Sequence, residues 1–202
     1  MKASISVENY LSARQWFDEA LICHKRSIII HVVSPNDLHG AIEALQHSHE
    51  LCYKALKKAY GLPWLRGMKG HNPSNEIKEI MARFFEIFPD KQDDPLWRQI
   101  IEWSKTQGNR MARLHNTTIY GDDDGHYPSE LFTEEQYGEY LGNVSLELEF
   151  WYRQLLYIGK ELNALSPEDE KQLVSTVQLG RALREDSELN IKIRKLVEER
   201  FK

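Results

Sequence analysis

The sequence is poor in cysteine and contains no long apolar run. Cys23 and Cys52 are the two cysteines of the 202 residues, and neither stands in a metal-ligand spacing. Both fall within apolar helical patterns, so we expect two buried thiols. The longest apolar stretch, Ser27 to Val33, is far shorter than the ~20 residues that cross a bilayer, and no apolar segment follows the single lysine at the N-terminus. A cytoplasmic protein with no membrane contact is therefore predicted.

Several nucleotide and metal motifs are also missing. The glycines form neither G-x-x-x-x-G-K nor G-x-G-x-x-G, and no serine stands in a nucleophile elbow. Asp122, Asp123 and Asp124, with His126 close by, lack the glycine and distal glutamate of an EF-hand loop. We therefore expect a solvated acidic turn there, no metal and no cofactor.

The charge is unevenly distributed. The formal net charge of −5 gives no support to non-specific nucleic-acid binding, yet the stretch from Lys54 to Arg83 is locally basic. From Leu114 to Tyr152 there is no lysine or arginine. A fold that brings Lys54 to Arg66 near Arg110 and Arg113 would create a basic concavity. Two solvated helix faces of opposite sign are the alternative, and the charge pattern leaves both open.

Helical periodicity dominates the chain. Apolar spacing predicts helices from Val7 through Val33, from Leu38 to Gly61, from Pro73 to about Phe88, from Pro95 onward, and from Thr133 to about Asn163. Since no strand pattern survives, we predict an all-α, up-and-down bundle of about five helices in residues 1–165. Ser166 and Pro167 mark the boundary to residues 166–202, a two-helix C-terminal extension that packs on the bundle or on a partner.

Specific caps support these assignments. Asp94 is the expected N-cap before Pro95, and Thr133 with Gln136 forms a capping box. Glu50 and Lys54 are four residues apart in the orientation that favours an ion pair. Gly108 either ends the fourth helix or weakens it, and Asn116 to Pro128 is interpreted as an acidic connection to the fifth.

Arg110 and His115 are the strongest candidates for chemistry. An imidazole can take a proton from a ribose 2′-hydroxyl while a guanidinium binds the phosphate oxygens of the transition state, without a metal. Five residues along an ideal helix separate the two side chains by about 140°. They converge if the helix bends or ends between them, if the arginine reaches round, or if a second subunit supplies one partner.

Four stretches follow one another between about residues 7 and 160: "AIEALQHSHELCYKALKKAYGL", with Glu50 and Lys54 at its core, "GHNPSNEIKEIM", "RMARLH" and "LFTEEQYGEYL". In this order they resemble the HEPN-domain family. The first resembles the family's second helix, and the second lies where the family has a His-Asp-Leu segment. The third fits the motif R-x4-6-H, and the fourth resembles the helix start that follows it.

The resemblance implies a helical bundle that dimerises and brings two R-x4-6-H motifs into one cleft. Active members are metal-independent endoribonucleases, frequently toxins with a nucleotidyltransferase-fold antitoxin as partner. On this basis Arg110 is the expected phosphate-binding residue, His115 the acid/base residue, and RNA the substrate. Asn109, Glu50 and Lys54 are grouped with them as binding residues.

A second alignment sets Ala112 to Leu114 against the A-R-Y segment of a subfamily linked to nucleotide binding. Arg113 is then the important arginine. The chain would be a non-catalytic module that binds a nucleotide or a nucleotidyltransferase-fold partner. A purely structural dimerisation protein is the third hypothesis.

Overall fold

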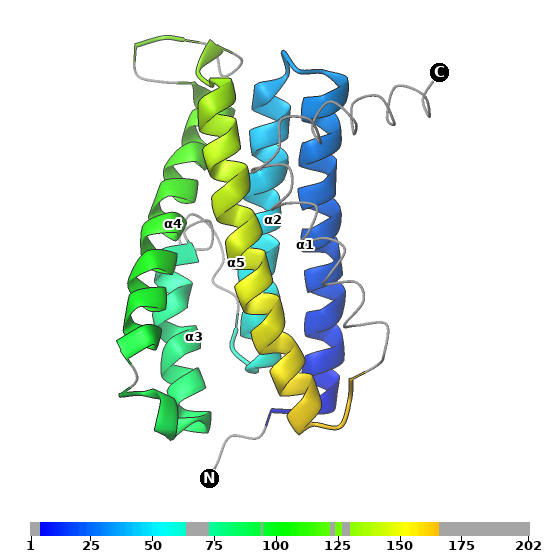
Figure 1. Cartoon of the computed structure of the whole chain (residues 1–202), viewed down its shortest axis with the longest axis vertical. Coiled ribbons are helices and arrows are strands. Elements are labelled where there is room, and N and C mark those ends of the chain that lie inside the picture. The colour runs from blue at the N-terminus through cyan, green and yellow to red at the C-terminus, as the bar shows by residue number, and fades with distance from the viewer. Residues whose placement is uncertain (1–4, 64–72, 94, 122–123, 127–129, 166–202) are drawn as a thin grey trace.

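The computed structural model describes residues 5–63, 73–93, 95–121, 124–126 and 130–165. In these residues the structure is all helical (Figure 1). The five α-helices are α1 (Val7–Val33), α2 (Leu38–Ala59), α3 (Pro73–Ile87), α4 (Pro95–Tyr120) and α5 (Glu134–Glu161), and a short 3-10 helix, η2 (Pro89–Lys91), precedes α4. The predicted all-α bundle is confirmed, whereas the predicted extension at 166–202 and the cap at Asp94 lie outside the described residues. No described helix is both long and apolar enough to span a bilayer.

Local sequence explains where several helices begin and end. The Ser6 side chain accepts a hydrogen bond from Asn9 N at 3.1 Å and starts α1. The expected capping box is present at α5, where Thr133 and Gln136 exchange both bonds. Gly61 follows α2 with φ +66°, a conformation that glycine adopts without strain.

The fourth helix is longer than predicted. α4 passes through Gly108 and His115 without ending and stops at Tyr120, so the start of the expected connection, Asn116 to Tyr120, is helical. Tertiary contacts explain the extra turn, since Thr118 is buried and its hydroxyl bonds Gln46 of α2 at 2.9 Å. Gly121, with φ +79°, then leaves the helix.

Successive helices do not all run in opposite directions, and the exception is α3. His39, at the start of α2, bonds Thr118 O at the end of α4, so these two helices are antiparallel. α3 is also antiparallel to α4, because the short η2 turn joins them and Phe84 packs on Trp97 at 4.4 Å. α2 and α3 therefore run in the same direction (Figure 1), and the predicted up-and-down order is wrong at this step. The tight η2 connection accounts for the antiparallel arrangement of α3 and α4.

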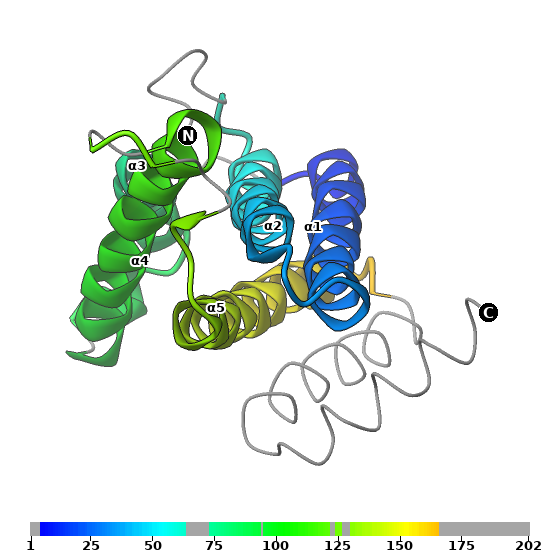
Figure 2. The same ribbon diagram turned by 90° about the horizontal axis from the view of Figure 1, so that it is seen from above.

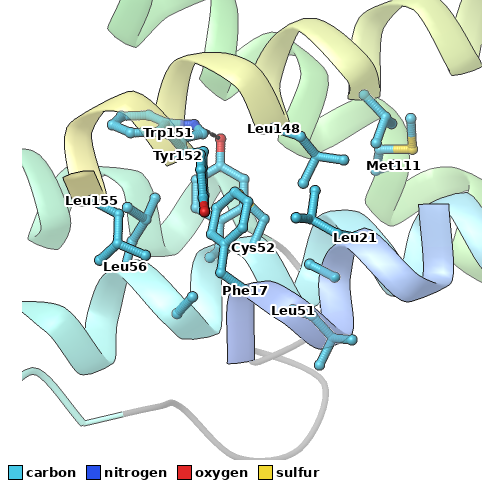
Figure 3. Close-up of a cluster of buried hydrophobic side chains, with 14 of the residues drawn as sticks. Phe17, Leu21, Leu51, Cys52, Leu56, Met111, Leu148, Trp151, Tyr152 and Leu155 are labelled. Carbon is cyan, nitrogen blue, oxygen red and sulfur yellow. Dashed lines mark hydrogen bonds between the residues drawn. The ribbon is translucent and has the colours of Figure 1, made fainter. Parts of the chain in front are cut away.

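The core lies where α1, α2 and α5 meet. Figure 3 shows Phe17 and Leu21 of α1, Leu56 of α2 and Tyr152 of α5 in one apolar cluster, with Met111 of α4 at one end. Figure 2 shows α1 at one edge of the bundle and α4 on the far side of α2. The candidate residues on α4 are thus remote from α1.

Candidate functional site

Arg110 is held by two side chains of α5. Its guanidinium donates two hydrogen bonds to Glu139, at 2.6 and 3.0 Å, and lies 5.1 Å from the centre of the Tyr140 ring. The hydrogen bond with Glu139 raises the pKa of Arg110, and the charge of Glu139 adds to the shift. Both partners of the pair are partly exposed, at 38% and 51%. Surface pairs of this kind contribute ~1 kcal/mol or less, so the pair orients the arginine more than it stabilises the fold.

His115 lies on another side of α4. Because the helix is continuous between the two residues, their side chains point about 140° apart. Met111 and Leu114, which are both buried, lie between them around the helix. Arg110 and His115 therefore flank the buried face of α4 from opposite sides, and His115 itself is half buried. A helix end between them, one of the routes to convergence, is excluded.

Arg113 and Asn109 are exposed residues of α4. Arg113 lies one turn after Arg110, on the same flank of the helix. Its backbone carbonyl accepts a bond from Thr117 at 3.2 Å, within the same helix. The two arginines are thus neighbours on one surface, whereas Arg110 and His115 are not.

Glu50 and Lys54 form the predicted ion pair, at 2.7 Å, but lie far from Arg110. Lys54 sits 5.8 Å from the ring of Trp16 on α1. The preceding residue, Tyr53, contacts Trp151 of α5, which lies eleven residues, or about 16 Å, beyond Tyr140. The structure does not bring this pair together with the α4 candidates.

A basic concavity was one of the two arrangements that the charge pattern left open, and the described ion pairs give it little support. Lys57 points into the bundle, where it is 1% exposed and pairs with Glu76 and Glu79 of α3. Lys54 pairs with Glu50, and Arg83 with Glu86 at 2.7 Å. Arg66 lies outside the described residues. Lys57 therefore joins α2 to α3, whereas Lys54 and Arg83 pair within their own helices.

A buried polar network was missed by the sequence reasoning. His49 Nε2 and the Tyr53 hydroxyl, the latter at 2.6 Å, both bond the Glu147 carboxylate, and Trp151 Nε1 donates to the tyrosine oxygen at 3.3 Å. Burial, and then the charge of Glu147, raise the pKa of Tyr53 well above its ordinary value. With His49 and Glu147 each 1% exposed, the network is closed to solvent and joins α2 to α5. The spacing of His49 and Tyr53 on one face of α2 was its only signal.

Other local features offer little chemistry. Between α1 and α2 lies a pocket of about 240 Å³, lined by Cys23, Arg26, Gly40, Glu43, Ala44 and His47. Desolvation raises the pKa of the Cys23 thiol, which disfavours a reactive thiolate. Among the described residues no group of three or more His, Cys, Asp or Glu side chains is placed to hold a metal. Of the three aspartates, Asp124 is exposed, and Asp122 and Asp123 are outside the described part.

Comparison with known proteins adds no further support. No family model matches the chain, and neither a curated protein nor a solved structure shows significant similarity to it. The resemblance to the HEPN family therefore rests on the motifs alone.

Proposed function

We propose that the chain is a HEPN-like helical module that binds a nucleotide through Arg113 and does not cleave RNA. The observation that carries this proposal is the engagement of Arg110 by Glu139. A guanidinium already neutralised by a bidentate carboxylate must give up two charge-assisted hydrogen bonds before it binds a phosphate. It also lacks His115 on its side of the helix.

Arg113 is the better-placed arginine. It is exposed on the same flank as Arg110, and a planar guanidinium matches the geometry of phosphate oxygens. The pair Arg110–Glu139 then serves as a fixed support one turn away. A nucleotide is favoured over RNA because the chain is acidic overall and two cations of its basic stretch, Lys54 and Lys57, pair with glutamates of the same chain.

Calorimetric titration with ATP and with GTP tests the proposal. We expect saturable binding, and we expect Arg113→Ala to weaken it at least about 10-fold because charged hydrogen bonds are each worth ~1.5–3 kcal/mol. Arg98→Ala is the matched control, since Arg98 is an exposed arginine on the same helix. An absence of heat with both nucleotides, or equal losses in the two variants, overturns nucleotide binding at Arg113.

A metal-independent ribonuclease is the second candidate. It is favoured by the partial exposure of both Arg110 and His115, which leaves each within reach of a second copy. Arg110→Ala and His115→Ala would each be inactive alone, yet a mixture would regain activity if one subunit supplies the arginine and the other the histidine. No activity in the mixture, with an active wild type, contradicts a shared site.

A further inference from the structure

One face of α1 carries exposed apolar side chains at both ends and near its middle. Val7, Leu11, Ile22, Ile29 and Val33 are 45%, 53%, 55%, 44% and 52% exposed. At 100° per residue these five positions fall within an arc of about 80°, and they span about 40 Å. Figure 2 shows α1 at the edge of the bundle, with α2 and α5 against its other sides. A stripe of this length is unusual on a surface that faces only water.

The polar residues in the same arc complete a regular pattern. Gln15, Asp18 and Lys25 fill the gaps, and we name the eight positions 7, 11, 15, 18, 22, 25, 29 and 33 the α1 stripe. From residue 11 to residue 29 the spacing alternates between four and three, which is the heptad spacing of a helix–helix seam.

The α1 stripe is also symmetric about the level of Ala20. Val7 and Val33 are equally far from that level, as are Leu11 and Ile29. A two-fold axis there would place the apolar ends of one helix against the apolar ends of its copy. Such self-complementarity is what an isologous dimer interface requires.

The charges of Asp18 and Lys25 favour an antiparallel over a parallel arrangement of two α1 helices. In the symmetric register, Asp18 is displaced by only three residues, about 4.5 Å along the helix, from Lys25 of the partner subunit. A parallel pair would instead set Asp18 against its own copy and Lys25 against its own copy. Asp18 also bonds Arg14 of its own chain at 3.4 Å and remains 39% exposed, so it stays accessible to a second partner.

We propose that the chain forms a two-fold dimer in which α1 packs antiparallel against α1 of a second copy. This dimer does not depend on nucleotide binding at Arg113. A second copy fits the stripe better than residues 166–202 do, because the apolar ends of the stripe match each other across the axis and Asp18 and Lys25 carry opposite charges.

Cross-linking of the full chain tests the register. In a Cys23→Ser background, Leu11→Cys and Ile29→Cys are prepared separately and mixed, and a short thiol-reactive cross-linker is added. We expect a covalent dimer in the mixture and little in either protein alone, because two copies of residue 11 would lie about 27 Å apart. A dimer from Leu11→Cys alone, or none in the mixture, overturns the antiparallel arrangement.

Sedimentation equilibrium tests the association itself. Ile22→Glu should raise the dissociation constant at least about 30-fold, since a symmetric dimer contains the substitution twice. Tyr157→Glu is the control, because Tyr157 is an apolar side chain of α5 that is 43% exposed and its substitution should leave association unchanged. Circular dichroism confirms that both variants fold. A monomeric wild type, as expected if residues 166–202 cover the stripe, refutes the proposal.

Discussion

At the scale of single residues, the contact between α1 and α5 contains many buried polar side chains. His24 Nε2 lies 2.8 Å from the Ser145 hydroxyl, and Ser27 pairs with Tyr137 at 3.2 Å. Since Ser145 donates to Leu141 O, its oxygen accepts from the histidine. A donating Nε2 is compatible with a neutral imidazole, and burial lowers the pKa of His24 to about 4.

The low pKa of His24 predicts acid sensitivity. Unfolded His24 binds a proton below its ordinary pKa of 6.5, while folded His24 stays neutral until about 4. The free energy of unfolding should therefore be highest above pH 6.5 and should fall by about 3 kcal/mol as the pH drops to 4. Urea unfolding between pH 7 and 4 measures this loss. His24→Asn should flatten the profile relative to wild type, and identical profiles would contradict the assignment.

At the scale of elements, the close approach of α5 to α1 depends on Gly159. A methyl group at this position would overlap the ring of Tyr10, which is fully buried. At Gly138 of the same helix, nothing lies within 4 Å of an added methyl group. An added methyl group would therefore clash at Gly159 but would meet open space at Gly138.

Alanine substitutions at these two glycines should have opposite effects. Helix propensity favours alanine over glycine by ~1 kcal/mol, so Gly138→Ala should stabilise the protein by up to about that amount. At Gly159 the clash should outweigh the gain, because overpacking a core costs ~1–3 kcal/mol. Denaturant midpoints of the two variants provide the comparison. Stabilisation by Gly159→Ala would show that α1 and α5 are less tightly packed than described.

The sequence predicted where the helices lie in the chain better than it predicted how they pack against one another. Periodicity located the five α-helices of the described residues, and α1 remained helical through the β-branched residues after Ser27 because Ile28 and His31 pack into the bundle. The end of α4 was misjudged, since a contact between Thr118 and Gln46, 72 residues apart, decides it. No local pattern contains such information.

For the candidate site residues, too, only contacts within one helix were predictable from the sequence. The ion pair of Glu50 and Lys54 was predictable because both residues lie on one helix. Other contacts depend on how α5 packs against α4 and α2. These are the ion pair between Arg110 and Glu139 and the hydrogen-bond network around Glu147. The distribution of charged residues along the sequence could not indicate that the Lys57 side chain points into the bundle.

At the scale of the whole molecule, the two proposals fit together. α1 and α4 lie on opposite sides of α2 (Figure 2). A dimer through α1 would hold the two α4 helices apart and leave Arg113 of each copy open to a ligand. It would not unite Arg110 of one copy with His115 of the other. The oligomer we infer therefore favours binding over a shared catalytic cleft.

An RNA cleavage assay tests directly whether the protein lacks ribonuclease activity. The purified protein in molar excess is incubated with total RNA in EDTA, and the RNA ends are analysed. We expect intact RNA for wild type and also for Glu139→Gln, because releasing Arg110 from the carboxylate leaves His115 on another side of the continuous α4. Cleavage that leaves 2′,3′-cyclic ends and is lost in His115→Ala would contradict it.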